Sequence, residues 1–229
     1  MSLSALALGL TFLASAGGDP HAAHREKPQI MAPGYSALEF DAPAPGSYEL
    51  PPLGQAEDGQ LVDSRGKALN LHDLYGDKVV VLSFIYTSCS DVNGCPLAGF
   101  VLKQLQQKIL DDPRLRDNAR LVSVSFDPQT DTPEVMQRYA GLFRREGFDW
   151  RFLTCETEAA LAPILAGYNQ WVLRDYDEEG RYLGSISHLL RVYLIDRKGR
   201  IRNIYSPSFL HADILYADIA TLLLEPGVP

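Results

Sequence analysis

A regular alternation of strand-like and helix-like segments most constrains the fold of this chain. Residues 79–85 form a continuous apolar run rich in β-branched side chains, which is typical of a strand buried on both faces. Apolar residues recur at helical spacing in the segments between the strands. Thr132 and Pro133 suit the cap and the first turn of one helix. The predicted strands are residues 79–85, 121–126 and 150–153, and the predicted helices are residues 96–110, 132–143 and 156–167.

Two hairpins and a last helix complete the pattern. Residues 59–62 and 68–71 flank a turn-rich segment, and residues 189–195 and 201–205 flank another. A final helix is predicted over residues 211–224. Alternating strands and helices imply a parallel sheet core, and the hairpins add antiparallel strands. We therefore expect an α/β, thioredoxin-like (peroxiredoxin-like) fold, with a central mixed sheet flanked by helices and β-hairpin extensions.

Length and charge limit the organisation and the partners. The 229 residues, of which 46% are hydrophobic, fit one globular domain, assigned to residues 56–225. Residues 17–55 are rich in Pro, Gly and Ala, which predicts a tether or an irregular wrap around the domain. The net charge of -8 argues against nucleic acid as a partner, because a phosphate backbone needs a basic surface.

The first 16 residues have the composition of a secretory signal peptide. A run of small apolar residues ends in Ala14-Ser15-Ala16, an A-x-A cleavage pattern, although no Lys or Arg precedes it. The run is shorter than the roughly 18 residues of a spanning helix. We expect export to the periplasm or another extracytoplasmic site, with membrane association but no clear spanning helix. His21 and His24, just beyond the leader, are interpreted as solvated tail histidines rather than a metal site.

Two of the three cysteines lie at a strand-to-helix junction. Cys89 follows the strand that ends near Tyr86, and Cys95 precedes Pro96, where a helix begins. A helix N-terminus favours thiolate, the form that attacks disulfides and binds soft metals. Asn93-Gly94 favours a tight turn that brings the two sulfurs together. The pair predicts a redox or metal function, and a plain structural disulfide is the alternative.

Four ordered motifs carry a family resemblance. The segment FIYTSCSDVNGCP at residues 84–96 resembles the F-x-Y-T-x-C-x-D-V-C-P signature of the Sco/SenC copper proteins, which assist assembly of the copper site of cytochrome oxidase. Residues 125–134 (SFDPQTDTPE) and 150–154 (WRFLT) are similar to two further family segments. His188, five residues before YLID at 193–196, matches the family's metal-binding histidine. The similarity covers about residues 55–224.

The resemblance implies that Cys89, Cys95 and His188 bind one copper ion, and that the chain acts as a copper chaperone for cytochrome c oxidase. The implied partner is the copper subunit of the oxidase or another exported thiol protein. Soft thiolates suit Cu(I), and imidazole suits either copper state. Without metal, a Cys89–Cys95 disulfide or thiol–disulfide exchange is implied instead. The chain departs from the family in one respect, because five residues rather than three separate its cysteines.

Other residues are given structural roles. Cys155 is interpreted as a buried small hydrophobe, with a third active thiol as the alternative. Asp91 is expected to cap the cysteine loop or to tune it electrostatically. Asp127 and Asp131 are expected to shape a turn and cap a helix, whereas His72 and His211 are expected to be surface or capping residues.

Two functions from other classes compete with copper delivery. An exported thiol–disulfide oxidoreductase would use the Cys89–Cys95 pair alone. A peroxidase would need the P-x-x-x-T-x-x-C pattern, but Leu82 stands where the proline belongs and only Ser88 separates Thr87 from Cys89. The sequence therefore argues against a peroxidase.

Overall fold

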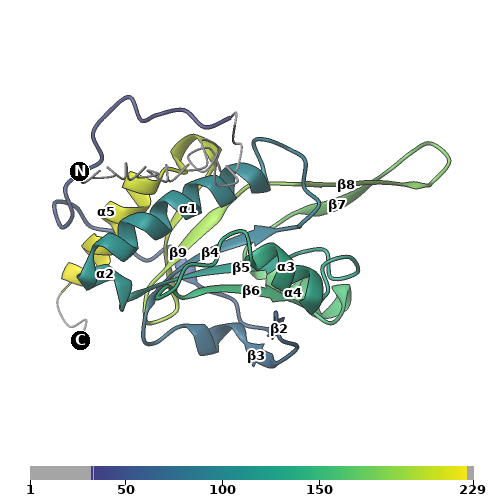
Figure 1. Ribbon diagram of the computed structural model, residues 1–229, viewed down its shortest axis with the longest axis horizontal. Coiled ribbons are helices and arrows are strands. Elements are labelled where there is room, and N and C mark those ends of the chain that lie inside the picture. The colour runs from purple at the N-terminus through teal and green to yellow at the C-terminus, as the bar shows by residue number, and fades with distance from the viewer. Residues whose placement is uncertain (1–31, 33, 226–229) are drawn as a thin grey trace, which may run out of the picture.

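The computed structural model describes residue 32 and residues 34–225. An eight-stranded sheet forms the centre of this part of the chain (Figure 1). In sheet order its strands are β1 (Gly54–Gln55), β10 (Arg200–Tyr205), β9 (Val192–Ile195), β4 (Val79–Ile85), β5 (Ala119–Ser125), β6 (Trp150–Thr154), β2 (Gln60–Asp63) and β3 (Ala68–Asn70). The strands β4, β5 and β6 run parallel to one another, and every other pair is antiparallel. The predicted mixed sheet is confirmed.

Helices cover both faces of this sheet. The α-helices of the described residues are α1 (Cys95–Asp111), α2 (Pro113–Arg116), α3 (Pro133–Ala140), α4 (Glu158–Gly167) and α5 (Ala212–Leu224), and short 3₁₀ helices span Leu71–Leu74 and Pro207–Phe209. Side chains of β4 alternate between two apolar clusters. Val80 and Leu82 pack with residues of α3 and α4, whereas Val79 and Val81 pack with residues of α1 and α5. Both faces of β4 are thus buried, as its apolar run predicts.

Local capping determines where two helices begin. Thr132 precedes α3 and its hydroxyl accepts a hydrogen bond from the backbone of Val135. Thr157 precedes α4 and accepts from Ala160 in the same way. Each cap satisfies one backbone N–H that has no partner within the helix. The prediction for Thr132 is confirmed, but α3 ends at Ala140 rather than at 143.

Both predicted hairpins are present. β2 pairs with β3, and β9 pairs with β10. The strand predicted over residues 189–195 begins only at Val192, so residues 189–191 lie outside it.

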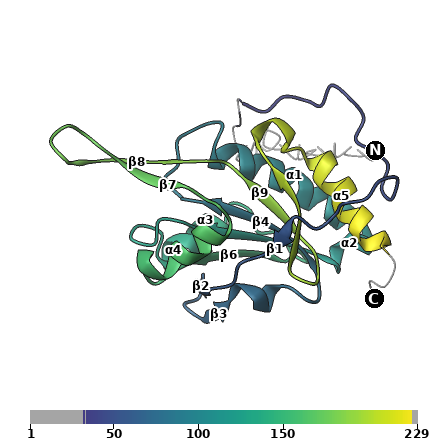
Figure 2. The same ribbon diagram turned by 180° about the vertical axis from the view of Figure 1, so that it is seen from behind.

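A third hairpin is missing from the sequence prediction. β7 (Val172–Tyr176) and β8 (Tyr182–His188) form a separate two-stranded sheet that extends away from the body (Figures 1 and 2). Its turn contains Gly180, which has a positive φ of 77°. The segment DEEG at 177–180 is a turn signal of the kind found in hairpins, so the sequence held a usable indication.

The N-terminal arm, residues 34–53, contains no helix or strand and lies along α1 and α5 (Figures 1 and 2). The ring of Tyr35 lies 4.9 Å from that of Phe100 and 5.2 Å from that of His211. Tyr48 donates a hydrogen bond to Asp218 on α5. These contacts attach the arm to one helical layer.

Some predictions lie outside the described residues. These are the signal peptide at residues 1–16 and the two tail histidines, His21 and His24. Among the helices that the structure describes, none has the length and apolar character needed to cross a bilayer.

Candidate metal and redox site

The cysteine loop, residues 86–94, begins at the carboxyl end of β4. In open α/β sheets this is the edge where ligands bind. A buried carboxylate fixes the start of the loop. Asp131 accepts hydrogen bonds from the backbone N–H of Thr87 at 3.0 Å, from the Thr87 hydroxyl at 2.5 Å and from Ser125 Oγ at 2.6 Å. Asp131 therefore supports the cysteine loop, which extends the structural role predicted for it.

A tight turn closes the loop before α1. The backbone N–H of Gly94 donates to the carbonyl of Asp91 at 2.9 Å, and the N–H of Asn93 donates to the Asp91 carboxylate at 3.0 Å. The capping role predicted for Asp91 is thus confirmed. Gly94 is closely surrounded, because a Cβ atom there would lie 3.3 Å from the Cys89 sulfur. The turn folds the chain back so that the two cysteines meet.

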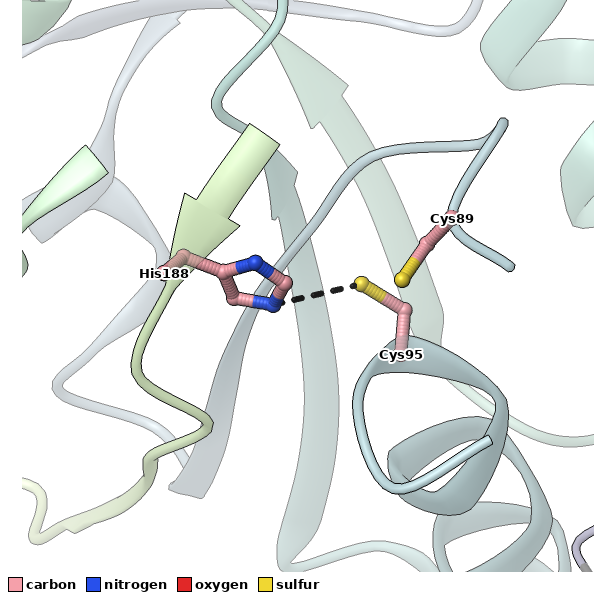
Figure 3. Close-up of side chains that lie close together, drawn as sticks. All are labelled: Cys89, Cys95 and His188. Atoms are coloured by element: carbon pink, nitrogen blue, oxygen red, sulfur yellow. Dashed lines mark hydrogen bonds between the residues drawn. The ribbon is translucent and has the colours of Figure 1, made fainter. Parts of the chain in front are cut away.

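Cys89, Cys95 and His188 converge at this edge (Figure 3). Their ligand atoms all lie within 4.8 Å of one another. The sulfur of Cys95 lies 3.8 Å from Nε2 of His188. Cys95 is buried in the core, whereas Cys89 and His188 are half-buried. Both cysteines are free thiols in this structure, so the disulfide between them stays a prediction.

The pKa values of the two thiols are shifted in opposite directions. The Cys95 thiol donates a hydrogen bond to the sulfur of Cys89, and backbone N–H groups of Cys95 and Asp91 add to it. These contacts lower the pKa of Cys89 to about 5, although burial opposes the change. The same hydrogen bond, together with burial, raises the pKa of Cys95 well above its usual value. The thiolate expected at the helix N-terminus is therefore assigned to Cys89 rather than to Cys95.

His188 is the last residue of β8 and is oriented by its neighbours. Its Nδ1 atom lies 3.0 Å from the carbonyl oxygen of Ile186. Because a carbonyl only accepts, Nδ1 carries the proton, and the lone pair of Nε2 faces Cys95 in the neutral ring. The rings of Phe126 and Tyr86 lie 4.8 and 5.6 Å from the imidazole. This arrangement leaves Nε2 as the donor atom available to a metal.

The donor set fits one soft metal ion. Metal bond lengths of about 2.3 Å to sulfur and about 2.0 Å to nitrogen put these two atoms about 3.7 Å apart when the bond angle is trigonal. The observed separation of Cys95 Sγ and His188 Nε2, 3.8 Å, is close to this value. A closed structural zinc site needs four ligands, and the group found among the described residues has three. Two thiolates and an imidazole are the ligand types that suit copper.

The SCO1/SenC family model matches residues 55–224. The chain belongs to the SCO1/SenC family. The SCO1 protein homolog of Bacillus subtilis is 24% identical over 162 residues, which are 71% of this chain and 76% of the relative. The comparison therefore covers most of the described residues.

Solved structures of the SCO1/SenC family share the fold. A SCO1/SenC family lipoprotein from Bacillus anthracis is 26% identical, with a TM-score of 0.63 over 76% of this chain and 99% of that one. Bradyrhizobium japonicum ScoI, whose structure has copper bound, is 25% identical, with a TM-score of 0.59 over 72% and 97%. The predicted thioredoxin-like fold is confirmed.

The remaining predicted residues lie apart from this group of ligands. Cys155 is buried and its thiol donates to the carbonyl of Gln60 at 3.4 Å, which supports its interpretation as a packed small residue. His72 is about half exposed beside Asp58, as expected for a surface residue. His211 is only 6% exposed, so its surface assignment is wrong. It is the N-cap residue of α5, as the capping alternative expects, although its side chain makes no cap hydrogen bond and its imidazole packs against Tyr35.

Sequence reasoning missed the residues that hold His188. Phe126 and Tyr86 lie within the SCO1/SenC motifs, so their positions were known but their contact with His188 was not. Asp127 was expected only to shape a turn. It is buried and forms an ion pair at 2.7 Å with Arg174 on β7, 47 residues away. No local pattern in the sequence signals that pair.

Proposed function

We propose that this protein binds one copper ion through Cys89, Cys95 and His188 and acts as a copper chaperone. The observation that carries the proposal is the convergence of these three side chains within 4.8 Å. Copper fits the two soft sulfur donors and the imidazole better than Mg²⁺ or Ca²⁺, which prefer oxygen ligands.

Each side chain has a separate task in this proposal. Cys89 is poised as a thiolate near neutral pH, because its pKa is lowered to about 5 by the Cys95 thiol and nearby N–H groups. Cys95, whose pKa is raised, has to lose its proton when it becomes a ligand. His188 offers Nε2 as a neutral donor while Nδ1 stays bonded to Ile186. Copper uptake is therefore expected to release a proton from Cys95.

The physiological role that we propose is delivery of copper to cytochrome c oxidase. This role is supported by a structurally similar protein, BsSco, which is described as a member of the Sco family of cytochrome c oxidase assembly proteins. We also propose that the chain is exported, because residues 1–16 have the composition of a signal peptide. The partner would be the copper subunit of the oxidase or another exported thiol protein.

Measurement of the copper ligands is the decisive experiment. Reduced protein is titrated with Cu(I) under anaerobic conditions against a moderate chelator, and X-ray absorption reports the ligands. The wild type is expected to bind one copper through two sulfurs and one imidazole, and Cys95→Ser and His188→Ala are expected to lose this site.

The chain offers matched controls of the same residue types. Cys155→Ser removes a buried thiol outside the ligand group, and His72→Ala removes an exposed imidazole. Both are expected to bind copper as the wild type does. Failure of the reduced wild type to outcompete the chelator would refute the proposal.

A thiol–disulfide oxidoreductase is the second candidate. The observation that favours it is the contrast between the half-buried, acidic Cys89 and the buried Cys95. An attacking thiolate beside a protected second thiol suits disulfide exchange, in which Cys89 attacks and Cys95 then releases the mixed disulfide.

Trapping tests this alternative. Cys95→Ser is expected to accumulate a mixed disulfide with a disulfide substrate, because the Cys89 thiolate attacks the S–S bond and one substrate sulfur leaves as a thiolate, whereas Cys89→Ser is expected to form none. A Cys89–Cys95 reduction potential below about -300 mV would mark an inert structural bridge and count against exchange.

A further inference from the structure

The third ligand stands on a part of the molecule that backbone pairing does not fix. β7 and β8 pair with each other, and in the described residues no strand of the main sheet pairs with them. On β8, Ile186 is the buried side chain. The hairpin also reaches well beyond the body (Figures 1 and 2). Side-chain contacts at its base must therefore hold His188 near the cysteines.

Arg174 makes the charged contact between the hairpin and the body. Its guanidinium donates to the buried Asp127 carboxylate at 2.7 Å and to Glu158 on α4 at 3.1 Å. The guanidinium carbon also lies 5.3 Å from the centre of the Tyr182 ring, on the partner strand. Arg174 thus contacts both strands of the hairpin and two segments of the body.

The link from this ion pair to His188 is short. Arg174 lies directly opposite Ile186 in the strand register, and the carbonyl of Ile186 is the group that holds His188 Nδ1. On the other side, Asp127 directly follows Phe126, whose ring packs 4.8 Å from the imidazole. A charge-paired arginine therefore joins the two surfaces between which His188 is held.

We propose that Arg174 and Asp127 form a positioning pair that holds the β7–β8 hairpin against the body and keeps His188 within reach of Cys89 and Cys95. The inference rests on the proposed copper function for its consequence, but its structural part concerns the metal-free protein. Without Arg174, the buried Asp127 carboxylate loses its ion-pair partner, which is costly in a site that excludes water. The hairpin then loses its charged contact with the body.

Loss of the positioning pair is expected to affect Cu(II) and Cu(I) binding differently, because the two copper states depend on His188 to different extents. Substitution of groups that orient a ligand commonly weakens metal affinity by about 10- to 100-fold. Arg174→Gln is therefore expected to weaken Cu(II) binding by about this factor and to reduce the nitrogen coupling in the Cu(II) paramagnetic resonance spectrum. Cu(I) binding is expected to change less, because both thiolates remain.

Amide hydrogen exchange on the metal-free protein is the first test. Arg174→Gln is expected to increase exchange across β7 and β8 by about tenfold while β4 and β5 stay protected. Arg181→Gln is the matched control, because Arg181 lies on the same hairpin but is 76% exposed and pairs only with its neighbours Asp177 and Glu179 in the structure described. Arg174→Lys keeps the charge and is expected to restore most of the protection.

The outcomes separate the two proposals. If wild type binds no copper, the copper function fails, and the exchange data still decide the positioning role. Asp127→Asn, which keeps an oxygen acceptor for Arg174, gives a second variant with the same expected direction. Unchanged hairpin exchange together with unchanged Cu(II) affinity in folded Arg174→Gln would overturn the positioning pair. Equal effects from Arg181→Gln would overturn it as well.

Discussion

The two cysteines and the histidine stand on parts of the molecule that are built differently. The cysteine loop leaves a strand whose every residue is buried and whose neighbours on both sides are hydrogen-bonded to it. His188 ends a strand that is mostly exposed and has one partner strand. The first part owes its shape to the core, and the second to a few side-chain contacts. Ligand geometry therefore depends on how firmly the weaker part is held.

The largest expected effect concerns the acidity of Cys89. The pKa of its thiol is lowered to about 5, and the first cause is the hydrogen bond from Cys95. Cys95→Ala removes that donor, so the pKa of Cys89 is expected to rise toward the usual value of about 8.5. Alkylation rate against pH measures the midpoint in reduced, metal-free protein.

His188→Ala is the comparison for this measurement. The contacts that lower the pKa of Cys89 come from residues 86–95, so His188→Ala is expected to move the midpoint much less than Cys95→Ala. An equal shift from both variants would mean that the hairpin shares control of the thiolate. The contrast between the two parts would then fail.

Core packing gives the next largest effect. Leu82 on β4 is fully buried, whereas Leu173 on β7 is 65% exposed. Leu82→Ala is expected to lower the free energy of unfolding by about 2 to 5 kcal/mol, because it leaves a cavity in the core. Leu173→Ala is expected to stay within about 0.5 kcal/mol. Urea unfolding of both variants measures the difference, and similar losses would contradict the comparison.

Two carboxylates that accept hydrogen bonds, one in the core and one on the exposed hairpin, extend the comparison between these two parts of the molecule. Asp131 accepts three hydrogen bonds in the core, and Asp175 accepts from Ser185 and Ser187 on the exposed hairpin. Asp131→Ala is expected to cost about 2 to 3 kcal/mol, because buried donors lose their acceptor. For Asp175→Ala the expected cost is below about 0.5 kcal/mol, since water replaces the carboxylate. Thermal and urea unfolding check both values.

The smallest effect expected is that of a helix cap on the body. Thr132→Ala removes the acceptor for the Val135 N–H and is expected to cost about 1 kcal/mol of unfolding free energy. Thr130→Ala, an exposed threonine two residues upstream, serves as the control and is expected to change little. A difference near zero between these variants would show that water caps α3 equally well.

Predictability from the sequence follows the same division. β4 and the cap at Thr132 were predicted because their signals are local, an apolar run and a polar residue before a proline. β7 and β8 were missed because an exposed hairpin needs no clean apolar alternation, although the turn at Gly180 was readable. The Arg174–Asp127 pair joins distant segments, and pairing at such separation leaves no local pattern.

The residues of the candidate site were predicted from the sequence, but the pKa difference between its two thiols was not. Cys89 and Cys95 were found from their position before a helix, and His188 through the family resemblance alone. Which thiol becomes acidic depends on the hydrogen bond between them and on the burial of Cys95, and neither can be derived from spacing.

The N-terminal arm reaches the cysteine loop through a close contact between Gly34 and Asn93. A Cβ atom at Gly34 would lie 1.7 Å from the Asn93 side-chain oxygen, so the N-terminal arm touches the cysteine loop itself. Any anchor attached upstream of the arm would therefore pull on the same edge that carries the ligands. A fully extended chain gains at most about 3.6 Å per residue, so each residue of such a tether sets how far the metal edge can stand from its anchoring surface. The working distance of the site would thus be encoded as a count of residues.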